Sequence, residues 1–175
     1  MKKIFFVIQF LCIMMMHFLS SQSSAIMIGM GTEELTSESA LIVRGEVAEV
    51  ETRWSADEKT IVTRVSVIIT DNIKGQTSSK MITVEYEGGE IGDIGLRVSD
   101  ISPLEMGEEV ILFLNPAKSM VEGDVYSIVG NAQGKYTVDK EGIARKSGFS
   151  VISGEDMIDN NIPVEKLIEK IRGIK

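Results

Sequence analysis

The stretch TIVTRVSVIITDNIKG, residues 60–75, is rich in β-branched side chains, lacks proline and ends on Lys-Gly. This composition predicts one long β-strand. Alternate residues of a strand point to the same face, so its odd-numbered apolar residues should contact a core. The other face mixes apolar with polar residues, and we expect it to be only partly covered. The odd-numbered apolar residues are Ile61, Val65, Val67, Ile69 and Ile73.

The segment before it, residues 40–54, predicts a second strand with one irregularity. Its first apolar positions alternate onto one face, whereas Val50 falls out of phase. A β-bulge near Ala48-Glu49 would restore the phase, because a bulge adds one residue to one strand of a pair. Residues 55–59, SADEK, predict the hairpin loop between the two strands. The positions in phase are Leu41, Val43 and Val47.

Two helices are predicted near the ends of the fold. Thr32 suits the N-cap of a short helix over residues 32–39, because a threonine hydroxyl can accept from a first-turn N–H. The second helix covers about residues 163–173, since Pro163 fits a first helical turn. Its apolar residues recur at helical spacing and predict an amphipathic helix packed on a sheet. They are Val164, Leu167, Ile168 and Ile171.

The remaining segments predict short strands separated by turns. Asn115-Pro116 should end the most apolar of them, since proline breaks a strand. Many short strands with a single terminal helix indicate a mostly β domain. A small closed barrel is the expected arrangement, because closure leaves no exposed sheet edge. The short strands are residues 81–87, 110–114, 126–129, 135–138 and 143–145.

The chain begins with MKK, an apolar run over residues 4–19 and a small-residue stretch over residues 20–25. This order is typical of a secretory signal peptide. We therefore expect residues 1–25 to be removed, leaving one domain over residues 26–175 that is secreted or periplasmic. A retained membrane anchor is the alternative, but the apolar run is shorter than the roughly 20 residues that a spanning helix needs.

Removal of that peptide would exclude several kinds of catalytic site and would change the net charge. Cys12 and His17 are the only cysteine and histidine, so the mature chain would lack disulfides, a thiol nucleophile and a Ser-His pair. The net charge is −8 for the whole chain. Without Lys2 and Lys3 it becomes −10, which disfavours nucleic acid and anionic membrane surfaces as partners. We predict no metal and no cofactor.

Five motifs stand in order within residues 35–140: LIVRGEVAEVETRW, TRVSVIITDNIKG, GGEIGDIGLRV, LEMGEEVILFL and YSIVGNAQGKYTV. They resemble a family of uncharacterised bacterial secreted proteins. The succession of strands is also similar to the netrin-like domain of tissue inhibitors of metalloproteinases. That resemblance implies a small OB-like, netrin-like β-barrel with flanking helices. Those inhibitors chelate zinc through a disulfide-tied N-terminal cysteine, whereas the predicted mature chain begins at Ile26 without a disulfide.

The glycine-rich segment, residues 88–98, is the main candidate site. Its four glycines permit unusual backbone angles and a compact loop that exposes N–H groups. One interpretation is a recognition loop for a peptide or protein; the other is a bulge and corner that closes the barrel. The predicted partner-binding residues are Gly88, Gly89, Glu90, Gly92, Asp93, Arg97 and Trp54.

Carboxylates and aromatic residues supply weaker candidates. Glu90 with Asp93 could serve a hydrolase, whereas the adjacent Glu108 and Glu109 should point to opposite strand faces and be structural. Trp54 should cover one end of the barrel or form a contact surface. Two acidic groups could bind calcium, although neither has the spacing of a known calcium loop. They are Glu90 with Asp93, and Glu155, Asp156, Asp159 with Asn160.

Tyr126 and Tyr136 lie on successive predicted strands, so the sequence predicts a cross-strand pair. Barrels of this type also stack sugars on aromatic side chains. The sequence as a whole favours a secreted, non-enzymatic binding module whose partner is another extracytoplasmic protein, with a peptidase as one candidate. A carbohydrate-binding module and a carboxylate-dependent hydrolase are the alternatives.

Overall fold

The computed structural model describes residues 26–154 and 158–174. Strands account for 49% and helices for 15% of the structure, so the predicted mostly β class is confirmed. The predicted signal peptide, residues 1–25, lies outside the described residues. Within the described ranges no helix is both long and apolar enough to cross a membrane.

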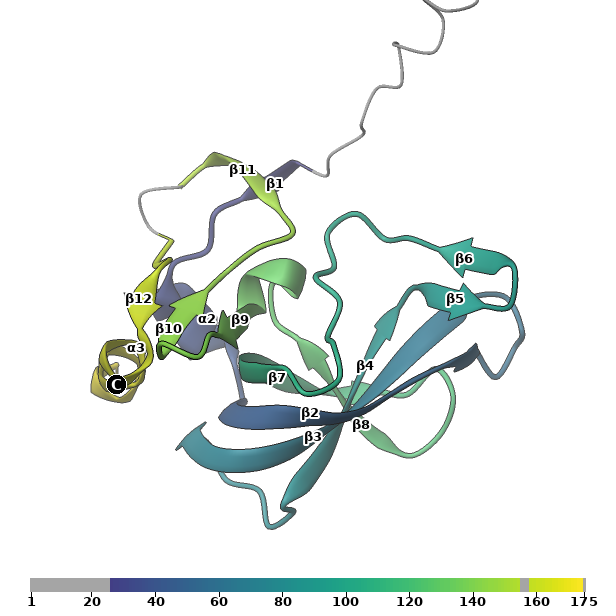
Figure 1. The fold of residues 1–175 in the computed structure, drawn as a ribbon, viewed down its shortest axis with the longest axis horizontal. Helices are drawn as coiled ribbons and strands as arrows, with labels where there is room; N and C mark the ends of the chain where they lie inside the picture. Colours follow the sequence, from purple (N-terminus) through teal and green to yellow (C-terminus); the bar gives the residue numbers. More distant parts are fainter. Residues whose placement is uncertain (1–25, 155–157, 175) are drawn as a thin grey trace, which may run out of the picture.

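Five strands form a closed ring (Figure 1). Neighbours in the ring pair in the order β7, β2, β3, β4 and β8, and β8 pairs back with β7. All these pairs are antiparallel except β4 with β8, which is parallel. The ring strands are β2 (Leu41–Trp54), β3 (Ile61–Lys74), β4 (Met81–Glu87), β7 (Glu109–Lys118) and β8 (Asp124–Ile128).

Three short strands extend the sheet away from the ring, in the order β9, β10 and β12 beyond β7. A separate parallel pair, β1 with β11, lies above them in Figure 1. These elements are β1 (Ile26–Ile28), β9 (Lys135–Val138), β10 (Ile143–Arg145), β11 (Ser150–Ser153) and β12 (Ile162–Pro163).

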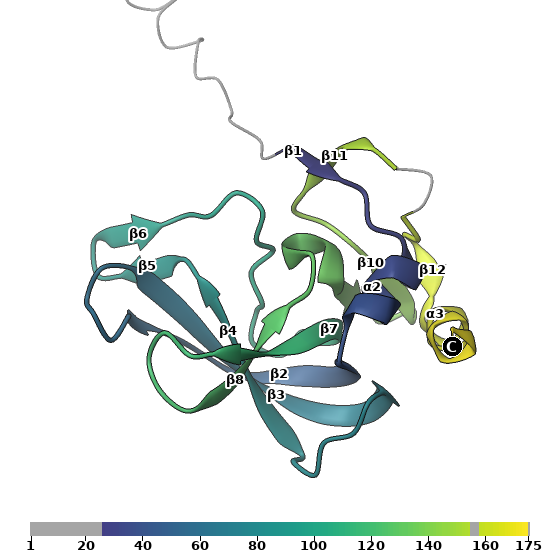
Figure 2. The ribbon, with the colours of Figure 1, turned by 180° about the vertical axis from the view of Figure 1, so that it is seen from behind.

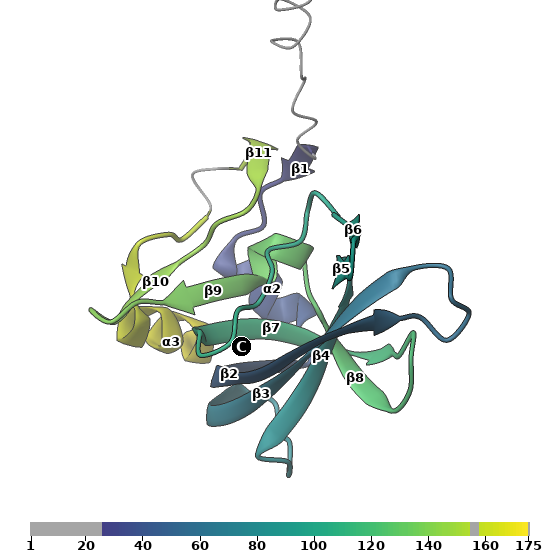
Figure 3. The same ribbon diagram turned by 45° about the vertical axis from the view of Figure 1, so that its right-hand side comes forward.

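Two helices cover the extended side of the sheet, where α2 contacts α3 (Figure 2). A 3-10 turn, η1, links β8 to β9. On the ring side, β5 and β6 form a two-stranded hairpin (Figure 3). The bounds are α2 (Thr32–Glu38), β5 (Gly89–Ile91), β6 (Ile94–Leu96), η1 (Asn131–Gly134) and α3 (Val164–Gly173).

Strand β7 is buried on both faces and separates two hydrophobic cores. Leu112 faces the core inside the ring, to which all five ring strands contribute, and which we call the ring core. Phe113, the next residue, faces the core beneath the two helices, which we call the helix core. A strand buried on both sides should read as a continuous apolar run, and VILFL does so.

The main strand predictions are confirmed. The pairing of β2 with β3 passes from Val47 opposite Val67 to Glu49 opposite Ser66, so Ala48 is the extra residue of the predicted bulge. The second face of β3 is only partly covered, as expected. The core-facing residues of its first face are buried, with Ile69 partly so.

The prediction that Asn115-Pro116 ends a strand is wrong. β7 continues to Lys118 and pairs there with β8. β2 accompanies β7 only as far as Leu114. Pro116 therefore lies beside a free edge, where its missing N–H removes no ladder hydrogen bond on that side.

Three side chains have roles other than those predicted. Gly31 is the N-cap of α2, and Thr32 lies in its first turn, where its hydroxyl donates to Asp159 Oδ2 at 2.5 Å. Tyr126 and Tyr136 do not pair, because their strands both pair with β7 rather than with each other. Tyr126 packs on the ring core, whereas Tyr136 is buried in the helix core.

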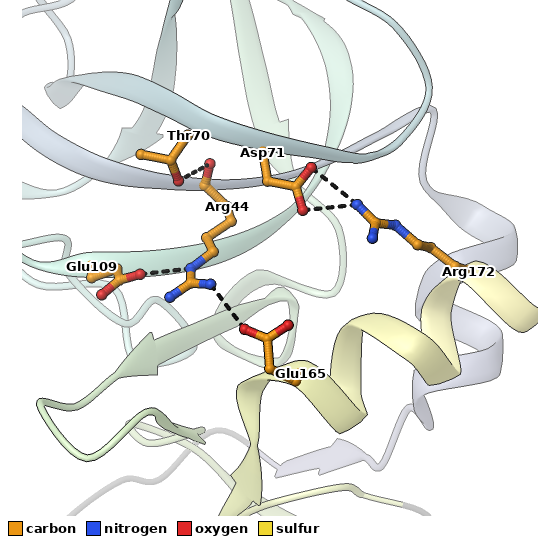
Figure 4. Close-up of polar contacts among 6 residues, drawn as sticks. All are labelled: Arg44, Thr70, Asp71, Glu109, Glu165 and Arg172. Atoms are coloured by element: carbon orange, nitrogen blue, oxygen red, sulfur yellow. Dashed lines mark hydrogen bonds and ion pairs between the residues drawn. The ribbon is translucent and has the colours of Figure 1, made fainter.

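Helix α3 docks through an apolar face and a polar rim (Figure 4). Arg172 donates to both carboxylate oxygens of Asp71 on β3, at 3.0 and 2.8 Å. Glu165 lies 3.4 Å from Arg44 on β2, which also pairs with Glu109 on β7 at 2.6 Å. The buried face is the predicted one, consisting of Val164, Leu167, Ile168 and Ile171.

Candidate functional site

Two glycines set the path by which the chain leaves β4. Gly88 and Gly89 have φ values of 111° and 125°, which L side chains rarely adopt. The Gly88 carbonyl accepts a hydrogen bond from Thr63 Oγ1 at 2.6 Å. A Cβ on Gly89 would lie 2.6 Å from atoms of both Thr52 and Thr63. Glycine is therefore required here to lay the backbone across β2 and β3.

The segment then forms a β-hairpin rather than the compact loop or bulge predicted. β5 and β6 pair with each other and with no other strand of the described residues. Gly92 and Asp93 make the two-residue turn, in which Gly92 has a φ of 59°, as a type II′ turn requires. Ile94 and Leu96 are exposed on this hairpin. The glycines thus build a projecting element.

A groove of about 760 Å³ lies between the hairpin, the ring and the segment that follows the hairpin. Four of the seven predicted contact residues line it, whereas three do not. The four are Gly88, Gly89, Glu90 and Arg97. The other three are Gly92 and Asp93, in the hairpin turn, and Trp54, at the end of β2.

Apolar side chains from distant parts of the chain form much of the groove wall. Val50 and Leu96 are 38% and 36% exposed, although they line the groove. Tyr86 also lines it, and its hydroxyl accepts a hydrogen bond from the Leu104 N–H at 3.1 Å. Burial raises the pKa of Tyr86, so the phenol is neutral at ordinary pH. The wall is thus apolar with one fixed polar group.

The charged residues of the groove form no ion pair with any other described residue. Glu87, Glu90 and Arg97 line it, yet none forms an ion pair within the described ranges. Both signs of charge are therefore available to a bound molecule. The sequence identified the charges of this segment, but it missed Val50, Tyr86 and the far wall, which come from other elements.

Trp54 lies apart from the groove. It is 40% exposed at the last position of β2 and stands opposite Ile61. The neighbouring Arg53 pairs with Glu51, two residues earlier on the same strand. Trp54 is thus available for contact, but it does not extend the groove surface.

The other carboxylates have structural partners or lie elsewhere. Glu108 pairs with Lys135 at 2.8 Å and Glu109 with Arg44 at 2.6 Å, so both have a structural partner, in agreement with the structural role predicted for them. Glu155 and Asp156 lie outside the described residues. Across the part of the chain that is described, no three His, Cys, Asp or Glu residues are placed to hold a metal ion.

Comparison with known proteins gives no family for this chain. No protein-family model matches the sequence, and no curated protein matches it. The groove and the hairpin beside it are the observations from which function is argued.

Proposed function

We propose that this protein is a non-enzymatic binding module that engages another extracytoplasmic protein through the groove beside the β5–β6 hairpin. The groove itself carries the proposal. Its volume of about 760 Å³ is within the range of ligand pockets, roughly 300–1,000 Å³. Exposed apolar residues gathered at such a groove are typical of a contact surface.

The composition of the groove supports a peptide segment as the bound element. Apolar walls such as Val50 and Leu96 suit an aliphatic or aromatic anchor side chain. Glu90 and Arg97 at the same groove form no ion pair with another described residue, and they suit the polar rim that orients a partner. A hydrolase has less support, because Glu90 lines the groove and Asp93 does not.

We further propose that the five-stranded ring is an OB-type barrel of the netrin-like kind. The first three ring strands pair consecutively, and the fourth, β7, returns to lie beside the first, β2. This order is a Greek key, and the OB-fold is a five-stranded Greek-key barrel. Such barrels bind ligands through strand faces and loops. The hairpin and groove are attached at one end of these strands.

The resemblance to tissue inhibitors of metalloproteinases does not extend to their zinc chelation. If residues 1–25 are removed on export, Ile26 becomes the N-terminus, and in β1 it pairs with Ser150 of β11. A terminal residue held in a sheet is poorly placed to enter another protein's active site. We therefore propose that a peptidase, if it is the partner, contacts the groove instead.

The experiment captures partners with the exported protein, tagged at its C-terminus and expressed from the full chain. Leu96→Glu places a charge in the groove, and because Leu96 is already part-exposed the fold should tolerate it. Met81→Glu is the matched control, since Met81 is exposed at the opposite end of β4 from the groove. We expect a specific protein to be recovered with wild type and Met81→Glu and lost with Leu96→Glu.

Equal thermal stability of the two variants establishes that the loss is local. Recovery by all three proteins alike would contradict the groove as the contact surface. Recovery of nothing above background by wild type would contradict protein binding itself. N-terminal sequencing of the exported protein tests the cleavage site in the same preparation, with Ile26 as the expected first residue.

A further inference from the structure

The second half of β2 has a neighbouring strand on one edge only. The strand pairs with β3 along nearly its whole length, but with β7 only from Leu41 to Glu46. Val47 still donates to the Glu108 carbonyl at 2.9 Å and accepts from the Gly107 N–H at 2.8 Å. Beyond Val47 no described backbone group bonds β2 on this side, so the second half of the strand has an open edge.

The exposure of this stretch agrees with an open edge. Residues 48–51 are all exposed, although alternate residues of a strand point to opposite faces. On β3, which pairs with this stretch, Val65 and Val67 are fully buried. Both faces of β2 are thus accessible next to its open edge.

The open edge presents the backbone groups of Val50 and Thr52. The Ser55 N–H donates to the Thr60 carbonyl at 2.9 Å, so the backbone of Ser55 is directed toward β3. Successive residues of an antiparallel strand alternate between bonding the partner strand and pointing away from it. Val50 and Thr52 therefore direct their N–H and C=O groups to the open edge. A row of such groups is a template for a further strand.

The two faces beside this edge differ in chemistry. On one face Val50 lines the groove beside the hairpin, together with Leu96 and Leu104. On the opposite face Glu49 and Glu51 line a separate pocket of about 170 Å³, which shares no lining residue with the groove. A strand added at the edge would place alternate side chains on these two faces, one apolar and one charged.

The charged face has a surplus of carboxylates. Glu49 forms no ion pair with any other described residue. Arg53 pairs with both Glu51 and Glu122, so one cation serves two carboxylates. The other cation of the pocket, Arg64, pairs with a buried carboxylate of β4. A basic side chain is therefore the electrostatic complement of this face.

We propose, as a step that rests on the proposed function, that the partner binds by strand addition to β2. The added segment is extended, and its apolar residues alternate with lysine or arginine. Its backbone bonds Val50 and Thr52 at the open edge, its apolar side chains enter the groove beside Leu96, and its basic side chains lie against Glu49. Main-chain hydrogen bonds give such complexes affinity, and pockets for alternate side chains give them specificity. Charges on an edge deter indiscriminate pairing, and here they favour a strand of opposite charge.

The test measures binding of a fluorescent heptapeptide, in which lysine and valine alternate, to the protein exported from the full chain. We expect saturable binding by fluorescence anisotropy. A peptide of the same composition with its lysines and valines in two blocks should not bind, and neither should a peptide in which glutamate replaces lysine. Both controls keep the valines but lose the match to the two faces.

N-methylated peptides test the backbone contacts without changing the side chains. In antiparallel pairing, a valine opposite Val50 directs its N–H to β2. Methylation of the valine nitrogens should therefore weaken binding at least about tenfold, whereas methylation of the lysine nitrogens should have little effect. The reverse pattern would support strand addition in the parallel sense. Equal effects of the two methylations would overturn strand addition.

Two protein variants test the same edge. Thr52→Pro removes a donor where proline is tolerated, at an open edge, and should weaken binding roughly fivefold or more. Glu49→Lys should weaken binding of the lysine peptide and strengthen that of the glutamate peptide. Met81→Glu, far from this edge on β4, should bind as wild type. The methylated peptides decide the matter on the wild-type protein even if Thr52→Pro fails to fold.

The outcomes separate this proposal from the groove-binding function itself. Peptide binding that Leu96→Glu abolishes but methylation does not affect would overturn strand addition and leave the groove as the contact surface. A captured partner without any binding of the alternating peptide would do the same. A second copy of this chain is the competing occupant of the edge. A dimer in sedimentation that Thr52→Pro dissociates would overturn the proposal in its favour.

Discussion

The ring core and the helix core lie on opposite faces of β7, yet they are built differently. The ring core consists of aliphatic residues with two tyrosines packed at its margin, Tyr86 and Tyr126. The helix core contains Tyr136 and is bordered by buried polar side chains. One of these, Gln133, accepts from the Met30 N–H at 2.7 Å and donates to the Ile28 carbonyl at 3.0 Å.

The two cores therefore contribute differently to the fold: the ring core stabilises the strands, and the polar contacts near the helix core determine which segments lie together. An apolar ring core stabilises the strands without selecting a particular partner for each side chain. Buried polar contacts in the helix region instead fix which segments meet, because each donor needs its acceptor. Among the described residues of this region, Thr36 Oγ1 and Lys146 Nζ are exceptions, because both are buried without a hydrogen-bond partner.

The largest effects are expected from the two adjacent residues of β7 that face different cores. Leu112→Ala and Phe113→Ala should each lower the free energy of unfolding by about 3–5 kcal/mol, because both side chains are fully buried. Urea titration followed by tryptophan fluorescence and circular dichroism measures both. Met106→Ala, at a highly exposed position, is the control.

Both variants should unfold in one transition, since each removes contacts from a strand that the two cores share. If Leu112→Ala lowered the stability of the ring alone, the two probes would give different midpoints. That result would show that the cores unfold separately and that β7 does not couple them.

The second-largest effect on stability is expected from a buried ion pair that joins β9 to the segment before β7. Lys135, on β9, pairs with Glu108 at 2.8 Å, and their side chains are 5% and 14% exposed. Lys135 also donates to the Pro103 carbonyl at 2.5 Å, next to the groove. Glu108→Gln should lower the free energy of unfolding by about 3 kcal/mol, because it leaves the lysine charge buried without a counter-charge.

Thermal and urea unfolding of Glu108→Gln, Lys135→Met and the double variant test this. The double variant should be more stable than Glu108→Gln alone, since it removes the uncompensated charge. A double variant less stable than either single one would mean that packing, not charge, is responsible.

Local patterns were sufficient for several elements. β4 has the predicted bounds, residues 81–87, and the bulge falls at Ala48, because strand parity is visible in a few neighbouring residues. The apolar face of α3 was equally readable from helical spacing. Pro116 shows the limit of this approach. Whether proline breaks a strand depends on a free edge, and an edge is a property of the whole sheet.

The candidate site was predictable only in part. Gly88 and Gly89 stand out by composition, but the requirement for glycine arises from Thr52 and Thr63, which lie far away in the sequence. The burial of Lys146 could not be predicted from its neighbours, since it stands between an arginine and a serine in a segment that is typical of a solvated loop. It is buried against Tyr136 of β9 and the segment before β12, where Asn160 bonds its backbone, and no local pattern reports these contacts.

The titration of Lys146 supplies a smaller, pH-dependent effect. Its pKa is lowered by burial to about 7 in the folded state, against about 10.4 unfolded. Between these values the unfolded chain binds more protons, so stability rises with pH and is level below pH 7. We expect a gain of about 2 kcal/mol from pH 7 to 9.

Among the described residues, Asp159 and Tyr136, which act on or contact Lys146, and Glu33 and Lys170, which belong to the same polar cluster, do not titrate in this window. Hydrogen bonding with Lys170 lowers the pKa of Glu33. The pKa of Asp159 is also lowered: burial acts to raise it, but hydrogen bonds from Lys170 and Thr32 outweigh burial. Hydrogen bonding with Asp159 raises the pKa of Lys170, and burial raises that of Tyr136. Lys146→Met should therefore unfold with nearly constant stability from pH 7 to 9, and a slope like that of wild type would refute the assignment.

The smallest effect is expected at the polar rim of α3. Arg172 and Asp71 form a bidentate pair, but their side chains are 52% and 36% exposed, so water screens the attraction. A double-mutant cycle of Asp71→Asn and Arg172→Gln should give a coupling energy below about 1 kcal/mol. Leu167→Ala, in the buried face of the same helix, should cost several times more. A coupling energy above 2 kcal/mol would mean that the polar rim contributes substantially to the docking of α3. Polar contacts would then determine the position of a surface helix as well as that of the buried segments near the helix core.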